Sequence, residues 1–243
     1  MSLQTFHGHI RDRLGEAIVA GLHPPGSALP PEPQLCAALG VSRTVVREAG
    51  KSLAAKGLVS IGPKVGTRVR PAAQWNWFDP EVVAWQTQAG LTSEFLHDVQ
   101  ELRRVVEPAA VRLAAARATS DDLAELEEAL AGMTRAVGDG GSHDSGDYVG
   151  HDLRFHQTLL AASHNRMMVQ MAKALAALLR TSFEVSTTQP GRAASSLPLH
   201  RAILDALHAR DAERAERASI TLIDSARDDI ESALASRRRR RAA

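Results

Sequence analysis

The chain has 243 residues, enough for one large domain or two small ones with ordinary cores. Aromatic residues make up only 4 % of it, and the single cysteine, Cys36, excludes an internal disulfide. No apolar run approaches the roughly 20 residues that cross a bilayer, and the first residues lack the pattern of a signal peptide. We therefore expect a mainly helical, cytoplasmic protein without a membrane partner.

The net charge of +1 hides an uneven distribution along the chain. Residues 1–71 hold nine Lys and Arg against four Asp and Glu, residues 72–236 hold fifteen against twenty-four, and residues 237–241 are five consecutive arginines. A basic first segment is expected if only that part contacts nucleic acid, because phosphate neutralisation supplies much of such binding. The arginine run is more typical of a disordered, solvated tail, and added non-specific affinity for DNA is the alternative.

The first 71 residues show three helical segments and one hairpin. Apolar residues at spacings of three and four predict an amphipathic helix over residues 4–21. A proline-rich stretch then breaks regular structure, and Glu32 begins a second helix. Two short β-branched runs around residues 62–64 predict a hairpin over residues 58–69.

The segment from Leu35 to Gly57 predicts a helix-turn-helix. Ser42 is a preferred N-cap, and Gly57 suits the position after a helix that runs from about Arg43 to Lys56. On a helical wheel, one side of this helix is apolar and the other is basic. A solvated face on an ordinary helix is the bland interpretation. Because a hairpin follows, we favour a winged helix that places the basic side in the major groove of DNA.

The string from Gly26 to Ala49, with Gly57-Leu-Val and Val65-Gly-Thr-Arg-Val, resembles the DNA-binding domain of GntR-family bacterial transcription regulators. This resemblance implies a set of DNA-contacting residues, which are Ser42, Arg43, Thr44, Arg47, Lys64 and Gly66. One position departs from the family, since Pro33 stands where an arginine usually follows the glutamate. A contact from the second helix is therefore expected to be missing or moved, which affects the operator sequence.

The remaining residues predict a junction and an all-helical body. Residues 72–90 hold all three tryptophans and are expected to form a packed hinge with a short helix after Pro80. Periodic segments follow over residues 92–118, 120–137, 147–163, 165–187, 195–209 and 211–235. The predicted domains are a winged helix (1–71), a junction (72–90), a helical bundle (91–236) and a basic tail (237–243).

Asp152 and His156 lie four residues apart, on one face of a helix, where a carboxylate and an imidazole can share a divalent cation. Alone, this spacing is more often a surface hydrogen bond. The segments around residues 101–110, 152–165 and 197–207 resemble the FCD effector-binding domain of the FadR subfamily of GntR regulators, which implies a metal held by Asp152, His156 and His200. The mixed N and O ligands suit Zn²⁺ or Ni²⁺.

The same resemblance implies an effector cavity. Arg103 matches an arginine whose planar group takes a carboxylate, although an ion pair with Glu107 four residues later is an equal alternative. Asn165 is a weaker candidate of the same kind. Family members that have a fourth ligand carry a histidine at the position of Leu222, so at most three protein ligands are expected here.

These features together predict a sequence-specific DNA-binding transcription regulator that is not an enzyme. The resemblance is strongest to the branch that responds to sugar acids. It implies a homodimeric repressor that a small carboxylate or sugar acid releases from a double-stranded, palindromic operator. The alternative is a metal-dependent enzyme in the helical body, tethered to DNA by the basic domain.

Overall fold

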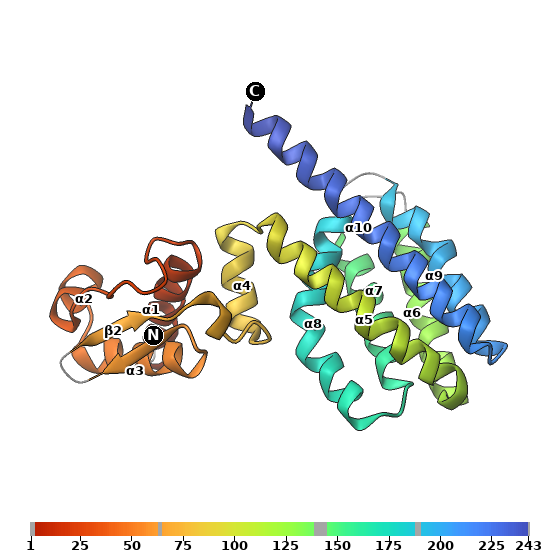
Figure 1. The fold of residues 1–243 in the computed structure, drawn as a ribbon, viewed down its shortest axis with the longest axis horizontal. Helices are drawn as coiled ribbons and strands as arrows, with labels where there is room; N and C mark the ends of the chain where they lie inside the picture. The colour runs from red at the N-terminus through yellow and green to blue at the C-terminus, as the bar shows by residue number, and fades with distance from the viewer. Residues whose placement is uncertain (1–2, 63–64, 139–144, 188–190, 243) are drawn as a thin grey trace. The chain divides into compact units, whose positions relative to one another are not determined.

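The computed structural model describes residues 3–62, 65–138, 145–187 and 191–242 (Figure 1). The chain divides into two compact units, Met1–Leu91 and Thr92–Ala243. The predicted fold class is confirmed, because a helix-turn-helix with a two-stranded wing precedes a bundle of helices. Within the described residues, no helix combines the length and the apolar character needed to cross a membrane.

The first unit is a winged helix with one additional helix. Its elements in chain order are α1 (Leu3–Val19), α2 (Glu32–Leu39), α3 (Arg43–Ala55), β1 (Val59–Gly62), β2 (Gly66–Val69), a 3-10 turn (Ala72–Gln74) and α4 (Pro80–Ala89). The two strands pair antiparallel, with Val59 opposite Val69 and Gly62 opposite Gly66. This hairpin is the predicted wing.

Local sequence signals set the turn between α2 and α3. Gly40 has a φ of 66°, in the left-handed region that glycine adopts without a steric penalty, and its amide donates to the Cys36 carbonyl. The Ser42 hydroxyl accepts a hydrogen bond from the Val45 amide and so caps the first turn of α3. The predicted helix-turn-helix therefore forms where these two signals place it.

The core of the first unit extends into α4. Its buried residues come from all its helices except α2 and include Ile18, Leu53 and Trp85. Lys56, at the end of α3, lies 2.7 Å from Asp79 Oδ2, and Arg11 of α1 lies 2.6 Å from Glu81 Oε1. Residues 72–90, which the sequence suggested as a junction, thus lie within the first unit and contribute buried and ion-paired side chains to it.

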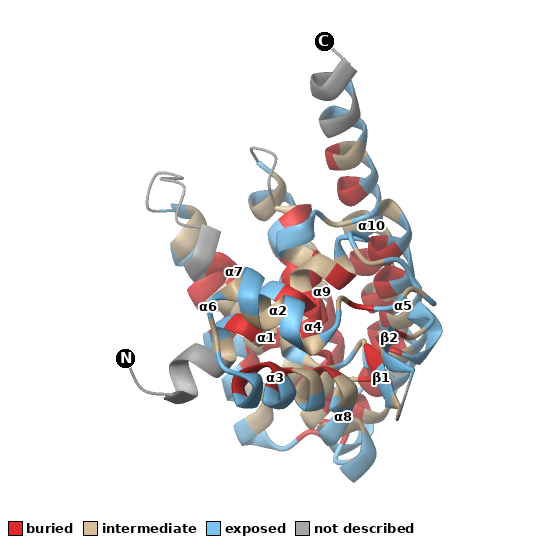
Figure 2. Ribbon diagram, turned by 90° about the vertical axis from the view of Figure 1, so that its left-hand side faces the viewer, coloured by how far each residue is buried: buried red, intermediate tan, exposed pale blue. Residues whose placement is uncertain are grey.

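The described part of the second unit consists of six helices. They are α5 (Ser93–Arg117), α6 (Ser120–Gly138), α7 (Ser145–Ala161), α8 (Arg166–Ser186), α9 (Arg192–His208) and α10 (Ala212–Ala242). The main packed pairs are α5 with α10, α6 with α7, α9 with α10, and α7 with α8. Figure 2 shows the buried residues of these helices in red and the exposed ones in pale blue, and residues 148–161 of α7 are all buried or intermediate.

The last helix differs from the sequence-based expectation. The arginine run was expected to be a disordered tail, but α10 continues as a helix through Ala242. Residues 212–242 contain neither glycine nor proline, and arginine is among the stronger helix formers, so nothing in the sequence ends the helix earlier.

Candidate DNA-binding surface and metal centre

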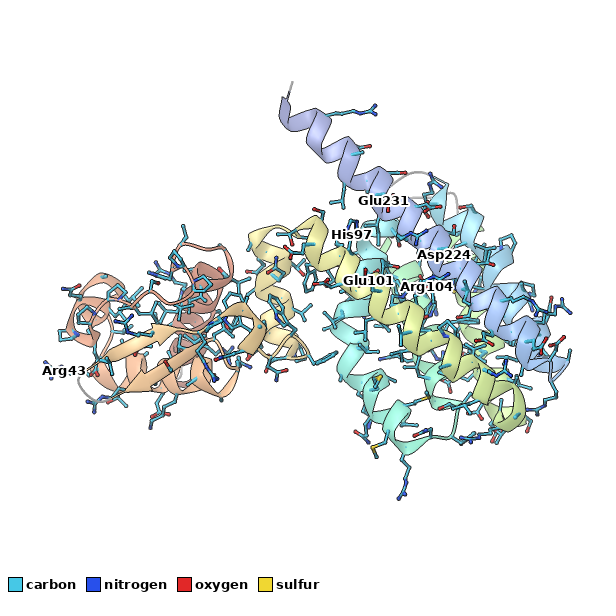
Figure 3. The ribbon with its side chains drawn as sticks, viewed as in Figure 1. Arg43, His97, Glu101, Arg104, Asp224 and Glu231 are labelled. Atoms are coloured by element: carbon cyan, nitrogen blue, oxygen red, sulfur yellow. The ribbon has the colours of Figure 1, made fainter. Side chains whose placement is uncertain are left out.

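The two sides of α3 have different environments. The exposed residues at its start and on its outer side are those expected to contact DNA, namely Ser42, Arg43, Thr44 and Arg47. The buried residues pack inside the first unit, namely Val45, Val46, Ala49 and Leu53. Arg43 projects outward at the start of the helix (Figure 3). The structure therefore presents these four side chains together on one accessible surface.

Arg47 takes part in an exposed ion pair. Its Nε lies 3.0 Å from Glu32 Oε2, and 70 % of the Arg47 side chain is exposed. Glu32 begins α2, and Pro33 follows in its first turn. Such a solvated pair contributes little stability, so a phosphate or a guanine edge can displace Glu32 at small cost.

The wing lies beside α3, which packs against β1. Gly66 is exposed with a φ of +72°, a conformation in which other residues are strained. Arg68 on β2 donates from Nη1 to the Gly26 carbonyl at 2.9 Å, which ties the wing to the segment before α2. Lys64, the other wing residue expected to contact DNA, lies outside the described residues.

Three buried side chains from two helices form a cluster in the second unit. Asp152 and His156 come from α7 and His200 from α9, and their ligand atoms all lie within 4.8 Å of one another. Asp152 Oδ1 lies 3.3 Å from His156 Nε2 and 3.1 Å from His200 Nε2. The structure thus brings together the three residues that the sequence analysis proposed, and we call them the three-ligand cluster.

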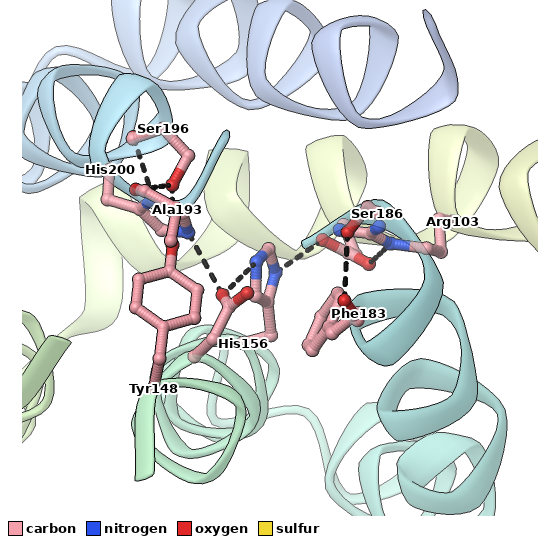
Figure 4. A network of polar contacts seen from close by, with 10 residues as sticks. Arg103, Tyr148, His156, Phe183, Ser186, Ala193, Ser196 and His200 are labelled. Atoms are coloured by element: carbon pink, nitrogen blue, oxygen red, sulfur yellow. Dashed lines mark hydrogen bonds and ion pairs between the residues drawn. The ribbon is translucent and has the colours of Figure 1, made fainter. Parts of the chain in front are cut away.

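The other nitrogen of each imidazole is already occupied by a hydrogen bond (Figure 4). His156 Nδ1 lies 2.7 Å from Glu107 Oε2, and His200 Nδ1 lies 2.9 Å from the Ser196 carbonyl. Because carboxylate and carbonyl oxygens accept hydrogen bonds, both rings carry a proton on Nδ1. Their Nε2 atoms remain directed at Asp152, as in histidines that ligate a metal.

Burial and charge act in opposite directions on the pKa values in this cluster. Burial alone would lower the pKa of His156, but the Glu107 and Asp152 carboxylates outweigh it and raise that pKa to about 9. Burial would raise the pKa of Glu107, yet Arg103 and His156 lower it to about 2. The two histidines likewise hold the pKa of Asp152 below its usual range against the effect of burial. Without a metal, the cluster is therefore a set of compensating buried charges.

The three-ligand cluster borders a small cavity of about 30 Å³. By the usual measure, this volume holds two or three waters. Leu222 lies in the cavity wall and is 4 % exposed. An apolar side chain thus occupies the position where some family members are expected to have a fourth ligand.

Arg103 lines the same cavity and is 2 % exposed. Its Nε donates to Glu107 Oε1 at 2.7 Å, so the ion pair considered as an alternative is present. Its guanidinium carbon also lies 4.7 Å from the centre of the Phe183 ring. Nη1 is buried and has no hydrogen-bond partner among the described residues. The ion pair therefore leaves part of the guanidinium available for an anion.

Asn165 is not part of this site. It caps α8, where its Oδ1 accepts a hydrogen bond from the Met167 amide at 3.0 Å. Asp224 of α10 is also outside this site, and its Oδ1 lies 2.9 Å from Arg104 Nε on the outer side of the bundle (Figure 3).

Several polar residues at the cavity escaped the sequence analysis. The Tyr148 hydroxyl lies 2.5 Å from Ser196 Oγ, and Arg192 Nη1 lies 2.6 Å from Asp229 Oδ1. These residues also line the cavity. Apart from their helical spacing, no signal in the single sequence distinguishes them from surface residues.

Comparisons with known proteins identify both units. Residues 6–69 match the model of bacterial regulatory proteins of the gntR family, and residues 98–225 match the FCD domain. The chain is 37 % identical over 215 residues to the galactonate operon transcriptional repressor of Escherichia coli, covering 87 % of this chain and 91 % of that protein. The chain belongs to the GntR family of bacterial transcription regulators.

Further relatives of this GntR regulator support the assignment to this family. The HTH-type transcriptional repressor NanR of Salmonella newport is 30 % identical over 208 residues, which cover 82 % of this chain and 75 % of that protein. A solved structure, Streptococcus agalactiae GntR, is 26 % identical, has a TM-score of 0.51, and is matched over 91 % of this chain and 99 % of its own. The relatives and matched domains are those of transcription regulators, so the prediction that the chain is not an enzyme is confirmed.

Proposed function

We propose that this GntR regulator is a homodimeric repressor, and that a small sugar acid or related carboxylate binds beside the three-ligand cluster and releases the operator. The observation that carries this proposal is the pairing, in one cavity, of a metal-type cluster with an arginine whose Nη1 is unpaired among the described residues. The lining suits an anionic, hydroxyl-bearing ligand, because the Arg103 guanidinium can donate to a carboxylate and the side-chain hydroxyl groups can bond to the ligand hydroxyls. The cavity of about 30 Å³ has to widen to admit such a ligand.

The donor set supports a metal ion in this cavity. One carboxylate and two imidazoles, each imidazole with its second nitrogen hydrogen-bonded, suit Zn²⁺ or Ni²⁺. When bound, the metal would supply an electrophilic centre for an oxygen of the effector. With Leu222 in the wall, Asp152, His156 and His200 would hold it and leave coordination positions open.

The relatives support the class of effector. The galactonate operon repressor of E. coli is named for a sugar acid, and it covers most of this chain. We therefore select D-galactonate as the first ligand to test. Arg103 would take the carboxylate, and the hydroxyl groups of Tyr148 and Ser196 lie on the same cavity for a polyhydroxylated chain.

The exposed side of α3 and the wing would contact DNA. Arg43 and Arg47 are long cations on the accessible side of α3, where they can reach base edges and phosphates, with Ser42 and Thr44 beside them. Gly66, and Lys64 as the sequence suggests, would bring the wing to the flanking backbone. A symmetric dimer would read two half-sites about one helical turn apart.

Operator binding measured with and without D-galactonate tests this proposal. A DNA fragment from upstream of the protein's own operon should give a discrete footprint. D-galactonate should weaken this complex, because a ligand that binds the non-binding state more tightly shifts the protein towards that state. Arg103→Lys, which keeps a cation beside Glu107, should bind the same operator but respond more weakly to the ligand, whereas Arg112→Lys, at an exposed arginine on the same helix, should respond normally. An unchanged ligand response in Arg103→Lys would contradict the assigned carboxylate site.

A further inference from the structure

We propose that Glu107 is a positioning residue for the metal, which orients His156 and keeps its Nε2 free for the cation. This inference rests on the metal site proposed above. It adds a residue that is not a metal ligand itself. Glu107 lies 49 positions before His156, the histidine that it orients.

Glu107 is fixed at both oxygens. It is fully buried on α5, where Oε1 accepts from Arg103 Nε and Oε2 accepts from His156 Nδ1, each at 2.7 Å (Figure 4). Because the two oxygens have partners from α5 and α7, the carboxylate has little freedom to rotate. The bond to Nδ1 therefore fixes the direction of the His156 ring.

This bond also selects the tautomer of His156. A neutral imidazole carries one proton, and an ionised carboxylate can only accept. In that form the proton sits on Nδ1 and the Nε2 lone pair is left for a metal. Without a metal, Nε2 also carries a proton near neutral pH and lies 3.3 Å from Asp152 Oδ1. His200 repeats the arrangement with the Ser196 carbonyl in place of a carboxylate. Both rings are thus held in the form that a metal requires.

The ion pair with Arg103 offsets the free-energy cost of burying the Glu107 carboxylate. The Arg103 guanidinium balances the charge of Glu107, and in the metal-free protein His156 offsets the charge of Asp152. Removing Glu107 alone would leave Arg103 buried without its ion-pair partner, and such a charge destabilises the fold. A single substitution would therefore mix a loss of folding with a loss of metal affinity.

Four full-length proteins separate these effects. They are the unaltered chain, Glu107→Gln, the double variant Arg103→Met with Glu107→Leu, and the control Glu101→Gln on the exposed outer side of α5 (Figure 3). After removal of bound metal, Zn²⁺ affinity is measured by calorimetric titration, and thermal unfolding is measured on the same metal-free samples. The double variant replaces both buried charges by apolar groups, which tends to preserve stability.

We expect Zn²⁺ to bind about 10- to 100-fold more weakly to Glu107→Gln and to the double variant, and with unchanged affinity to Glu101→Gln. Ring ¹⁵N spectra of His156, recorded above its pKa of about 9, should show the proton on Nδ1 in the unaltered protein and a mixture of tautomers in the double variant. If the double variant unfolds at the normal temperature and binds Zn²⁺ normally, Glu107 serves folding alone and the inference is overturned. If even the unaltered protein binds no Zn²⁺, the proposed metal site fails, and the inference fails with it.

Discussion

The substitution Gly15→Ala, which adds one methyl group to α1, tests how closely α4 packs against α1 in the first unit. Gly15 lies in the middle of α1, and a Cβ at this position would come within 2.5 to 2.6 Å of three ring atoms of Trp85. Trp85 is rigid and 2 % exposed, so it cannot move into solvent to avoid the contact. Gly50 in α3 is the matched control, because its nearest neighbour would be Ile61 Cδ1 at an ordinary 3.5 Å.

The two substitutions should have opposite signs. Replacing glycine by alanine inside a helix contributes about 1 kcal/mol through helix propensity. Overpacking a filled core costs about 1–3 kcal/mol, which exceeds this gain at Gly15 and is absent at Gly50. Gly15→Ala should therefore lower the free energy of unfolding of the first unit by about 1 kcal/mol, and Gly50→Ala should raise it by a similar amount.

Tryptophan fluorescence isolates the first unit in the full chain. All three tryptophans lie between residues 75 and 85, within that unit. A unit of this size shifts its melting temperature by about 4–8 °C per kcal/mol, so the two variants should melt about 8–16 °C apart. If both variants were stabilised equally, the close packing of α1 against Trp85 would be refuted.

Other substitutions test the two binding sites. Arg47→Ala should weaken operator binding by about 1–3 kcal/mol in a titration, whereas Arg13→Ala on the exposed part of α1 should not. Asp152→Ala, His156→Ala and His200→Ala should each lower the metal content measured by elemental analysis, and content equal to that of the unaltered protein in all three would argue against the site. Chelating the metal should lower the melting temperature of the second unit, followed by circular dichroism, because a ligand stabilises the state that binds it. Leu222→His should tighten Zn²⁺ binding in a competition assay, since residue 222 lines the cavity.

The elements that were predictable from sequence depend on local signals. Ser42 caps α3 and the glycine before it turns the chain, and both effects act over a few residues. The spacing of Asp152 and His156 likewise fixes a shared helix face. The wing follows from two β-branched runs around a short turn.

The remaining site residues depend on contacts that span the chain. His200 lies 48 residues from Asp152, and only the resemblance to a known domain placed the two together. The ion pair of Glu107 with Arg103 was foreseeable, because the two residues lie four positions apart on one helix. The contact of Glu107 with His156 was not, because it arises from the packing of α5 against α7. Periodicity shows that such positions are buried without showing which helices meet there.

The extent of the first unit matters to anyone who wishes to express the DNA-binding half alone. A fragment that stops at residue 71 would lack Trp75, Val82 and Trp85, and would leave Lys56 without its two carboxylate partners. Its apolar residues would then face water and favour aggregation. A fragment that continues through Leu91 retains the whole compact unit. Crystallisation and operator-binding screens on the isolated half should therefore begin with the longer piece.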